Sequence, residues 1–132
     1  MNYEQIKSYM LNKPETMLDY PFGVDVEVYK VKDKMFATLS MGTGNEKNTD
    51  GKLAGHYCVN LKCDPDEAVM LRDIFPAVLP GYHMNKALWN TIILDGSIPR
   101  GEIERMVDNS FMLVVNKMPK REQRSILIKH QP

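Results

Sequence analysis

The fold is decided by residues 80–96, which read Pro80-Gly81-Tyr82-His83-Met84-Asn85-Lys86-Ala87-Leu88-Trp89-Asn90-Thr91-Ile92-Ile93-Leu94-Asp95-Gly96. The pairs Pro80-Gly81 and Asp95-Gly96 favour turns and bound the segment. Between them we predict a short strand around residues 82–84, a turn through residues 85–87 and a strand over residues 89–94, where β-branched and apolar side chains are concentrated. Such short connections favour antiparallel pairing of neighbouring strands.

Upstream, residues 24–41 predict an antiparallel hairpin, because apolar side chains recur at every second position and Lys32-Asp33-Lys34 can reverse the chain. The alternation changes parity near Tyr29, which indicates a β-bulge. A third strand is predicted over residues 57–61, while residues 15–23 show no clear period. Residues 42–55 contain four glycines among polar residues, a composition that predicts a mobile loop.

Three helices are predicted around these strands. Asn2 and Gln5 have the spacing of a capping box, so the first helix begins at the N-terminus and ends at Lys13-Pro14. Asp64 and Pro65 favour the start of a second helix that runs to residue 75. Apolar residues at three- and four-residue steps predict a third helix from about residue 99 to residue 118.

The predicted order is therefore α-β-β-β-α-β-β-α, which places the chain in the α+β class. We expect a two-layer α/β sandwich in which helices lie on one side of a five-stranded antiparallel sheet. At 132 residues the chain fits one domain, assigned to residues 1–119, followed by a basic C-terminal tail over residues 120–132.

Composition restricts the classes of function. Lys plus Arg equals Asp plus Glu at 17 each, so any nucleic-acid binding must come from a local basic patch. The N-terminus lacks a basic region followed by an apolar run, and no apolar stretch approaches the ~18 residues of a membrane span, so we expect a cytoplasmic protein with no membrane partner. Cys58 and Cys63 are separated by four residues, which fits neither a C-x-x-C site nor a disulfide framework.

Two segments carry a resemblance to a known family. The first is PGYHMNKALWNT at residues 80–91, followed by LDGS at residues 94–97, and the second is YPFG at residues 20–23, followed by VYKVKDKMFA at residues 28–37. Together they resemble the MmcQ/YjbR family, small bacterial proteins described as DNA-binding. The resemblance implies a fold similar to that of type III secretion chaperones, in agreement with the order of elements predicted above.

Residues 82–90 are the first candidate for a binding surface, because Trp89 offers a stacking face and the two Asn side chains offer paired donors and acceptors. The alternative is structural: Trp89 half-buried at the start of a strand and Asn85-Lys86 satisfying a turn. Basic side chains at the hairpin and in the tail are the second candidate. The predicted binding residues are Tyr82, His83, Asn85, Lys86, Trp89, Asn90, Lys30, Lys32, Lys34, Lys120, Arg121 and Arg124.

These candidates support three hypotheses. The first is a non-enzymatic protein that binds double-stranded DNA through its Lys and Arg patches. The second is a chaperone-like, dimeric protein-interaction module, since ten Met side chains offer adaptable apolar contact. The third is a small-ligand pocket around residues 82–89.

Catalytic and metal chemistry have little support in the sequence. Cys58 and Cys63 could pair with His56 or His83, but no local pattern places a base beside either thiol. The three His residues are far apart and no paired carboxylates accompany them, so neither a metal nor another cofactor is predicted.

Overall fold

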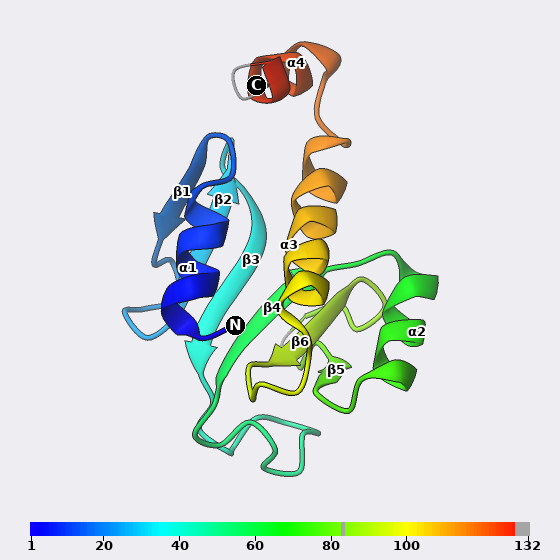
Figure 1. Cartoon of the computed structure of the whole chain (residues 1–132). Coiled ribbons are helices and arrows are strands. Elements are labelled where there is room, and N and C mark those ends of the chain that lie inside the picture. The colour runs from blue at the N-terminus through cyan, green and yellow to red at the C-terminus, as the bar shows by residue number, and fades with distance from the viewer. Residues whose placement is uncertain (83, 129–132) are drawn as a thin grey trace.

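The computed structural model describes residues 1–82 and 84–128 and centres on a six-stranded antiparallel sheet with the order β1-β2-β3-β4-β6-β5 (Figure 1). The strands are β1 (Thr16–Asp19), β2 (Glu27–Val31), β3 (Lys34–Met41), β4 (Tyr57–Lys62), β5 (Val78–Pro80) and β6 (Trp89–Ile93). Every neighbouring pair is antiparallel. The α+β class and the two-layer architecture predicted from the sequence are confirmed, with one strand more than expected.

The helices α1 (Tyr3–Leu11), α2 (Pro65–Ile74) and α3 (Arg100–Val115) lie on one face of this sheet (Figure 1). The main core is between them and the strands, where Tyr29, Phe36 and Leu39 are almost completely buried together with residues of α3. Helix α4 (Lys120–Ile128) follows α3 and lies beyond the end of the sheet. We call the helix-covered side of the sheet the first face and the opposite side the second face.

Local signals in the sequence place several boundaries correctly. Asn2 and Gln5 form the complete capping box of α1, and the Asp64 side chain accepts hydrogen bonds from the backbone at the start of α2. The predicted bulge is present: Tyr29 pairs with Ala37 whereas Lys30 pairs with Met35, so Phe36 is the additional residue in β3. The Phe36 ring contacts Phe111 of α3 edge to face, with ring centroids 5.3 Å apart.

Other predicted boundaries were wrong. Residues 16–19 form the edge strand β1 although they have no clear apolar period, because an edge strand with little burial needs no such pattern. Strand β2 begins at Glu27, and Val24 is exposed in the turn before it. The strand predicted around residues 82–84 is replaced by β5, which ends at Pro80 at the edge of the sheet, where a missing amide donor is tolerated. Tyr82 and Met84 lie outside any strand, and His83 lies outside the described residues.

The predicted C-terminal tail and the loop predicted to be mobile are both packed against the protein. Residues 120–128 of the predicted tail form α4, whose Ile126 is completely buried. In the loop of residues 42–56, Leu53 is also completely buried, and the backbone of Gly42 packs so closely that an added Cβ would lie 1.9 Å from the Leu53 carbonyl oxygen. The low apolar content of both segments gave no sign of these few buried side chains.

Candidate functional site

The second face of the sheet carries a row of buried polar side chains across three strands. Thr38 of β3, Asn60 of β4 and Thr91 of β6 are direct neighbours in the strand registers, and all three are buried. The Thr91 hydroxyl donates to Asn60 Oδ1, and Asn60 Nδ2 donates to Thr38 Oγ1 at 2.9 Å. Because each donor points from β6 toward β3, the row ends at the Thr38 hydroxyl.

A pocket of about 370 Å³ lies above this row. Its lining residues are Phe22, Val26, Met35, Thr38, Ser40, Asn60, Tyr82 and Met84. Phe22 comes from the YPFG segment, whereas Tyr82 and Met84 come from the PGYHMNKALWNT segment. The structure therefore brings residues of the two segments that carry the family resemblance into the lining of one pocket, although 60 residues separate Phe22 from Tyr82 in the chain.

Tyr82 is held on the polar floor of this pocket. Burial raises the pKa of its hydroxyl, and hydrogen bonds with the Ser40 and Asn60 side chains oppose that shift only in part. The hydroxyl therefore stays protonated at neutral pH and acts as a neutral hydrogen-bonding group. No Asp, Glu, Lys or Arg lines the pocket within the described part of the chain, so the interior suits an uncharged group with polar edges.

A second depression, of about 470 Å³, is basic, and we call it the lysine groove. It is lined by Lys32, Lys34, Met35, Lys62, Val114, Lys117, Met118, Pro119 and Glu122. The hairpin lysines thus lie beside the start of the C-terminal region. In the sequence these two groups of basic residues were separate candidates for phosphate contacts. Lys62, at the end of β4, also lines the groove. It was not among the predicted binding residues, because nothing in the sequence around it indicated a binding role. Met35 borders both the lysine groove and the pocket.

The charges in the lysine groove are incompletely balanced. Lys32 pairs with Glu15 at 3.5 Å, but Lys34, Lys62 and Lys117 have no ion-pair partner within residues 1–82 and 84–128. Burial lowers the pKa of Lys62 below its ordinary value of 10.5, and the nearby positive charge of Lys117 lowers it further. A bound anion would relieve this repulsion, so the lysine groove has the electrostatic character of an anion site.

The remaining predicted basic residues are distributed differently. Lys30 forms an ion pair with Asp19 at 2.9 Å and does not line the groove. Lys120, Arg121 and Arg124 are exposed on α4, which begins directly after the groove residues Met118 and Pro119. They can extend the basic surface beyond the groove but do not line it.

Residues 85–90 divide into exposed and structural side chains. Asn85 is exposed and its Oδ1 accepts from the Ala87 amide at 3.0 Å, which fixes the turn, and Lys86 is exposed. Asn90 is only 2% exposed on the first face, where its Oδ1 accepts from Arg72 Nε at 2.7 Å. Arg72 also donates to the backbone oxygen of Lys86, so the contact ties α2 to the turn. Asn90 therefore has a structural role, and its amide points to the first face of the sheet, away from the pocket.

Trp89 points to the second face beside Lys62, its register partner across β4 and β6. It is partly buried and does not belong to the main core. Its position fits the half-buried structural alternative and also leaves an aromatic surface next to a groove lysine.

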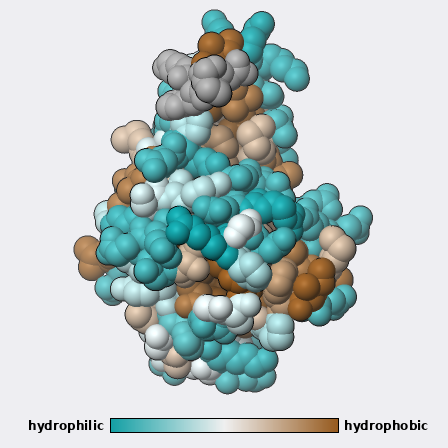
Figure 2. All heavy atoms as spheres, viewed as in Figure 1, coloured by the Kyte–Doolittle hydropathy of each residue, from teal (hydrophilic) through white to brown (hydrophobic). Residues whose placement is uncertain are grey.

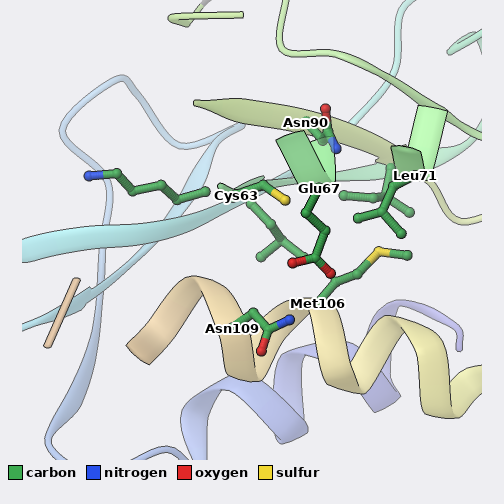
Figure 3. A pocket seen from close by; sticks show the side chains of 9 residues that line it. Cys63, Glu67, Leu71, Asn90, Met106 and Asn109 are labelled. Atoms are coloured by element: carbon green, nitrogen blue, oxygen red, sulfur yellow. The ribbon is translucent and has the colours of Figure 1, made fainter. Parts of the chain in front are cut away.

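The first face contains a smaller cavity, shown in Figure 3 between α2, α3 and the sheet. Cys63, Glu67, Leu71, Asn90, Met106 and Asn109 are among its lining residues. Its volume of about 10 Å³ holds no more than roughly one water, so we regard it as a packing defect of the core.

The thiols and histidines do not form a reactive cluster in the described residues. Cys58 and Cys63 are buried and unpaired, and burial raises their pKa values to about 12 and about 11. Such thiols are poor nucleophiles at neutral pH. No group of three His, Cys, Asp or Glu side chains is placed to hold a metal in residues 1–82 and 84–128. No described helix has the length and apolar character needed to cross a membrane.

Comparison with known proteins identifies relatives over most of the chain. The model of the YjbR family matches residues 11–113. The chain is 32% identical over 128 residues to the uncharacterized protein YjbR of Escherichia coli K12, covering 97% of this chain and 98% of that protein. It is 44% identical over 116 residues to the uncharacterized protein YyaQ of Bacillus subtilis, covering 83% of this chain and 95% of YyaQ.

Solved structures share the fold. The crystal structure of Deinococcus radiodurans protein DR2400 superimposes with a TM-score of 0.78 at 27% identity, covering 95% of this chain and 87% of DR2400. A crystal structure of a Pseudomonas syringae protein gives a TM-score of 0.75 at 31% identity, covering 86% of this chain and 98% of that protein. On the sequence matches and the shared fold, this chain belongs to the YjbR family.

Proposed function

We propose that the protein is a non-enzymatic DNA-binding protein, acting in the bacterial cytoplasm, whose lysine groove contacts the phosphate backbone of duplex DNA. The observation that supports the proposal best is the groove itself, where Lys34, Lys62 and Lys117 converge with no ion pair among the described residues and with Glu122 as the one acidic residue of the described lining. Phosphate contacts of this kind give affinity without sequence selectivity.

Local arrangement reconciles this proposal with the net charge of zero. Most acidic side chains that form ion pairs do so elsewhere: Glu27 with Lys7, Asp108 with Lys13, and Glu67 with Arg105. The lysine groove keeps an excess of positive charge, and the exposed basic residues of α4 continue it. A patch of this size supports weak, salt-sensitive binding.

Fluorescence anisotropy with a labelled 20-base-pair duplex tests the proposal. We expect Lys34→Gln combined with Lys117→Gln to weaken binding roughly tenfold or more at moderate salt, because two phosphate contacts are lost. The matched control is Lys47→Gln with Lys52→Gln, which removes the same charge from exposed positions in the loop of residues 42–56. Equal weakening by both pairs would mean that net charge, and not the lysine groove, determines binding.

A second function, protein interaction, is supported by the outer surface of α2. Val69 and Met70 are each 53% exposed and Ile74 is 57% exposed, and Figure 2 shows hydrophobic atoms gathered over this helix. These three side chains lie on one helix of ten residues, so the exposed apolar surface is continuous along α2. If this surface mediates self-association, sedimentation should give a dimer mass that Met70→Glu reduces to that of a monomer.

A further inference from the structure

We infer that the pocket on the second face binds an unpaired nucleobase, so that the protein prefers DNA with an extrahelical or single-stranded nucleotide over a fully paired duplex. The inference rests on the proposed DNA-binding function and adds the chemical group that the pocket accepts. It is carried by the lining of the pocket and by its position beside the lysine groove.

The pocket matches a base in shape and polarity. A nucleobase is flat and neutral, with apolar faces and hydrogen-bonding edges. Phe22, Val26, Met35 and Met84 supply apolar walls. The polar part of the lining includes Thr38, which is 96% buried and carries a hydroxyl at the end of the hydrogen-bonded row. With a volume of about 370 Å³ and no lining Asp, Glu, Lys or Arg among the described residues, the site suits a base and excludes a phosphate.

Phe22 supplies a stacking surface at the mouth of the pocket. It is 66% exposed, so its ring is accessible to a ligand. Aromatic stacking on bases is worth ~1–3 kcal/mol per base and does not depend on which base is present. Phe22 therefore provides affinity for an unpaired base, whereas the Thr38 hydroxyl offers a hydrogen-bonding group to the edge of the base.

The lysine groove adjoins the pocket and offers cations for the phosphates of such a nucleotide. Met35 borders both depressions, so a chain that places one base in the pocket can continue directly into the groove. Trp89 is the register partner of Lys62 on the same face, which gives a second aromatic side chain next to a cation. Alternation of cations and aromatic rings along one surface is the pattern used by proteins that bind single strands.

A base that is paired in a duplex cannot enter a pocket whose floor is buried beneath loops. It must leave the stack first, at a cost of a few kcal/mol, which is lowest for a nucleotide that is already unpaired. The pocket thus favours bulged, gapped or single-stranded DNA, whereas a fully paired duplex contacts only the lysine groove.

The test compares a 20-base-pair duplex with the same duplex carrying one extrahelical thymidine. We expect the bulged duplex to bind about tenfold more tightly, since stacking at this level corresponds to roughly that factor. Phe22→Ala should abolish the preference for the bulged duplex, and Thr38→Val should reduce that preference. Val24→Ala, an exposed residue of the same turn, is the matched control and should retain it.

The outcomes separate this inference from the proposed function. Salt-sensitive binding of both DNAs with equal affinity overturns the base pocket and leaves the DNA-binding proposal intact. Absence of binding to either DNA overturns the proposed function. In that case an NMR titration with thymidine alone decides the pocket: shifts at Thr38 and the Asn60 amide up to millimolar nucleoside support a base site, and unchanged spectra refute it.

Discussion

Asn90 offers a sharp test of which residues in the PGYHMNKALWNT segment are structural. We predict that Asn90→Ala lowers the free energy of unfolding by about 2–4 kcal/mol. The larger part comes from the lost bond with the Arg72 guanidinium at 2.7 Å, since hydrogen bonds to charged groups are worth about 1.5–3 kcal/mol. The weaker bond from Asn90 Nδ2 to the Ala68 oxygen at 3.4 Å adds a smaller amount.

Urea unfolding followed by circular dichroism measures this loss. With a slope of about 2 kcal/mol per M, a loss of 3 kcal/mol lowers the midpoint by about 1.5 M. The matched control is Asn85→Ala, because Asn85 is exposed and fixes only a local turn; its cost should stay below about 1 kcal/mol. If Asn90→Ala costs no more than Asn85→Ala, the assignment of Asn90 to the scaffold is wrong.

The remaining predictions concern the C-terminal helix, the pH dependence of stability and the thiols. Ile126→Ala should remove amide-exchange protection from α4 while β4 keeps its protection, because a nine-residue helix is unstable without packing; Ile128→Ala, which is 64% exposed, should have little effect. Burial favours a raised pKa at Glu27, but hydrogen bonds from Tyr29, Tyr3 and Lys7 outweigh it and lower the pKa below 4.5. The ionised Glu27 carboxylate therefore stabilises the folded protein fully above pH 4.5, and this stabilisation is lost as the pH falls through the lowered folded-state pKa. Glu27→Gln should be less stable than the unchanged protein, and its stability should depend less on pH. Urea unfolding from pH 3 to pH 6 measures both effects. Cys58 and Cys63 should resist iodoacetamide at pH 8 until urea unfolds the protein, because burial raises both thiol pKa values; fast labelling of the folded protein would contradict their burial.

Local chemistry explains which parts of the fold were predictable. Asn2, Asp64 and the change of parity at Tyr29 act through neighbours close in sequence, so their consequences could be read directly. Strand β1 was missed because its backbone pairs with β2 while its side chains bury little. Helix α4 was missed because Lys120, Arg121 and Arg124 dominate its composition, whereas its attachment depends on Ile126.

The candidate site was only partly predictable for a related reason. Tyr82 was identified from its motif and Lys34 from its charge, but their surroundings depend on the sheet register. Thr38, Asn60 and Thr91 look like ordinary polar residues within strands until the register aligns them. Lys62 gave no signal because its relation to Lys117 exists only after α3 packs on the sheet.

The central claim is that the lysine groove binds DNA phosphates, and the salt dependence of duplex affinity tests it most directly. If Lys32, Lys34, Lys62 and Lys117 each neutralise one phosphate, the plot of log affinity against log salt should have a slope of about −3.6. Lys34→Gln with Lys117→Gln should reduce its magnitude by about 1.8, while Lys47→Gln with Lys52→Gln should leave it unchanged. A slope that the groove substitutions do not alter, or no duplex binding at low salt, would contradict the account.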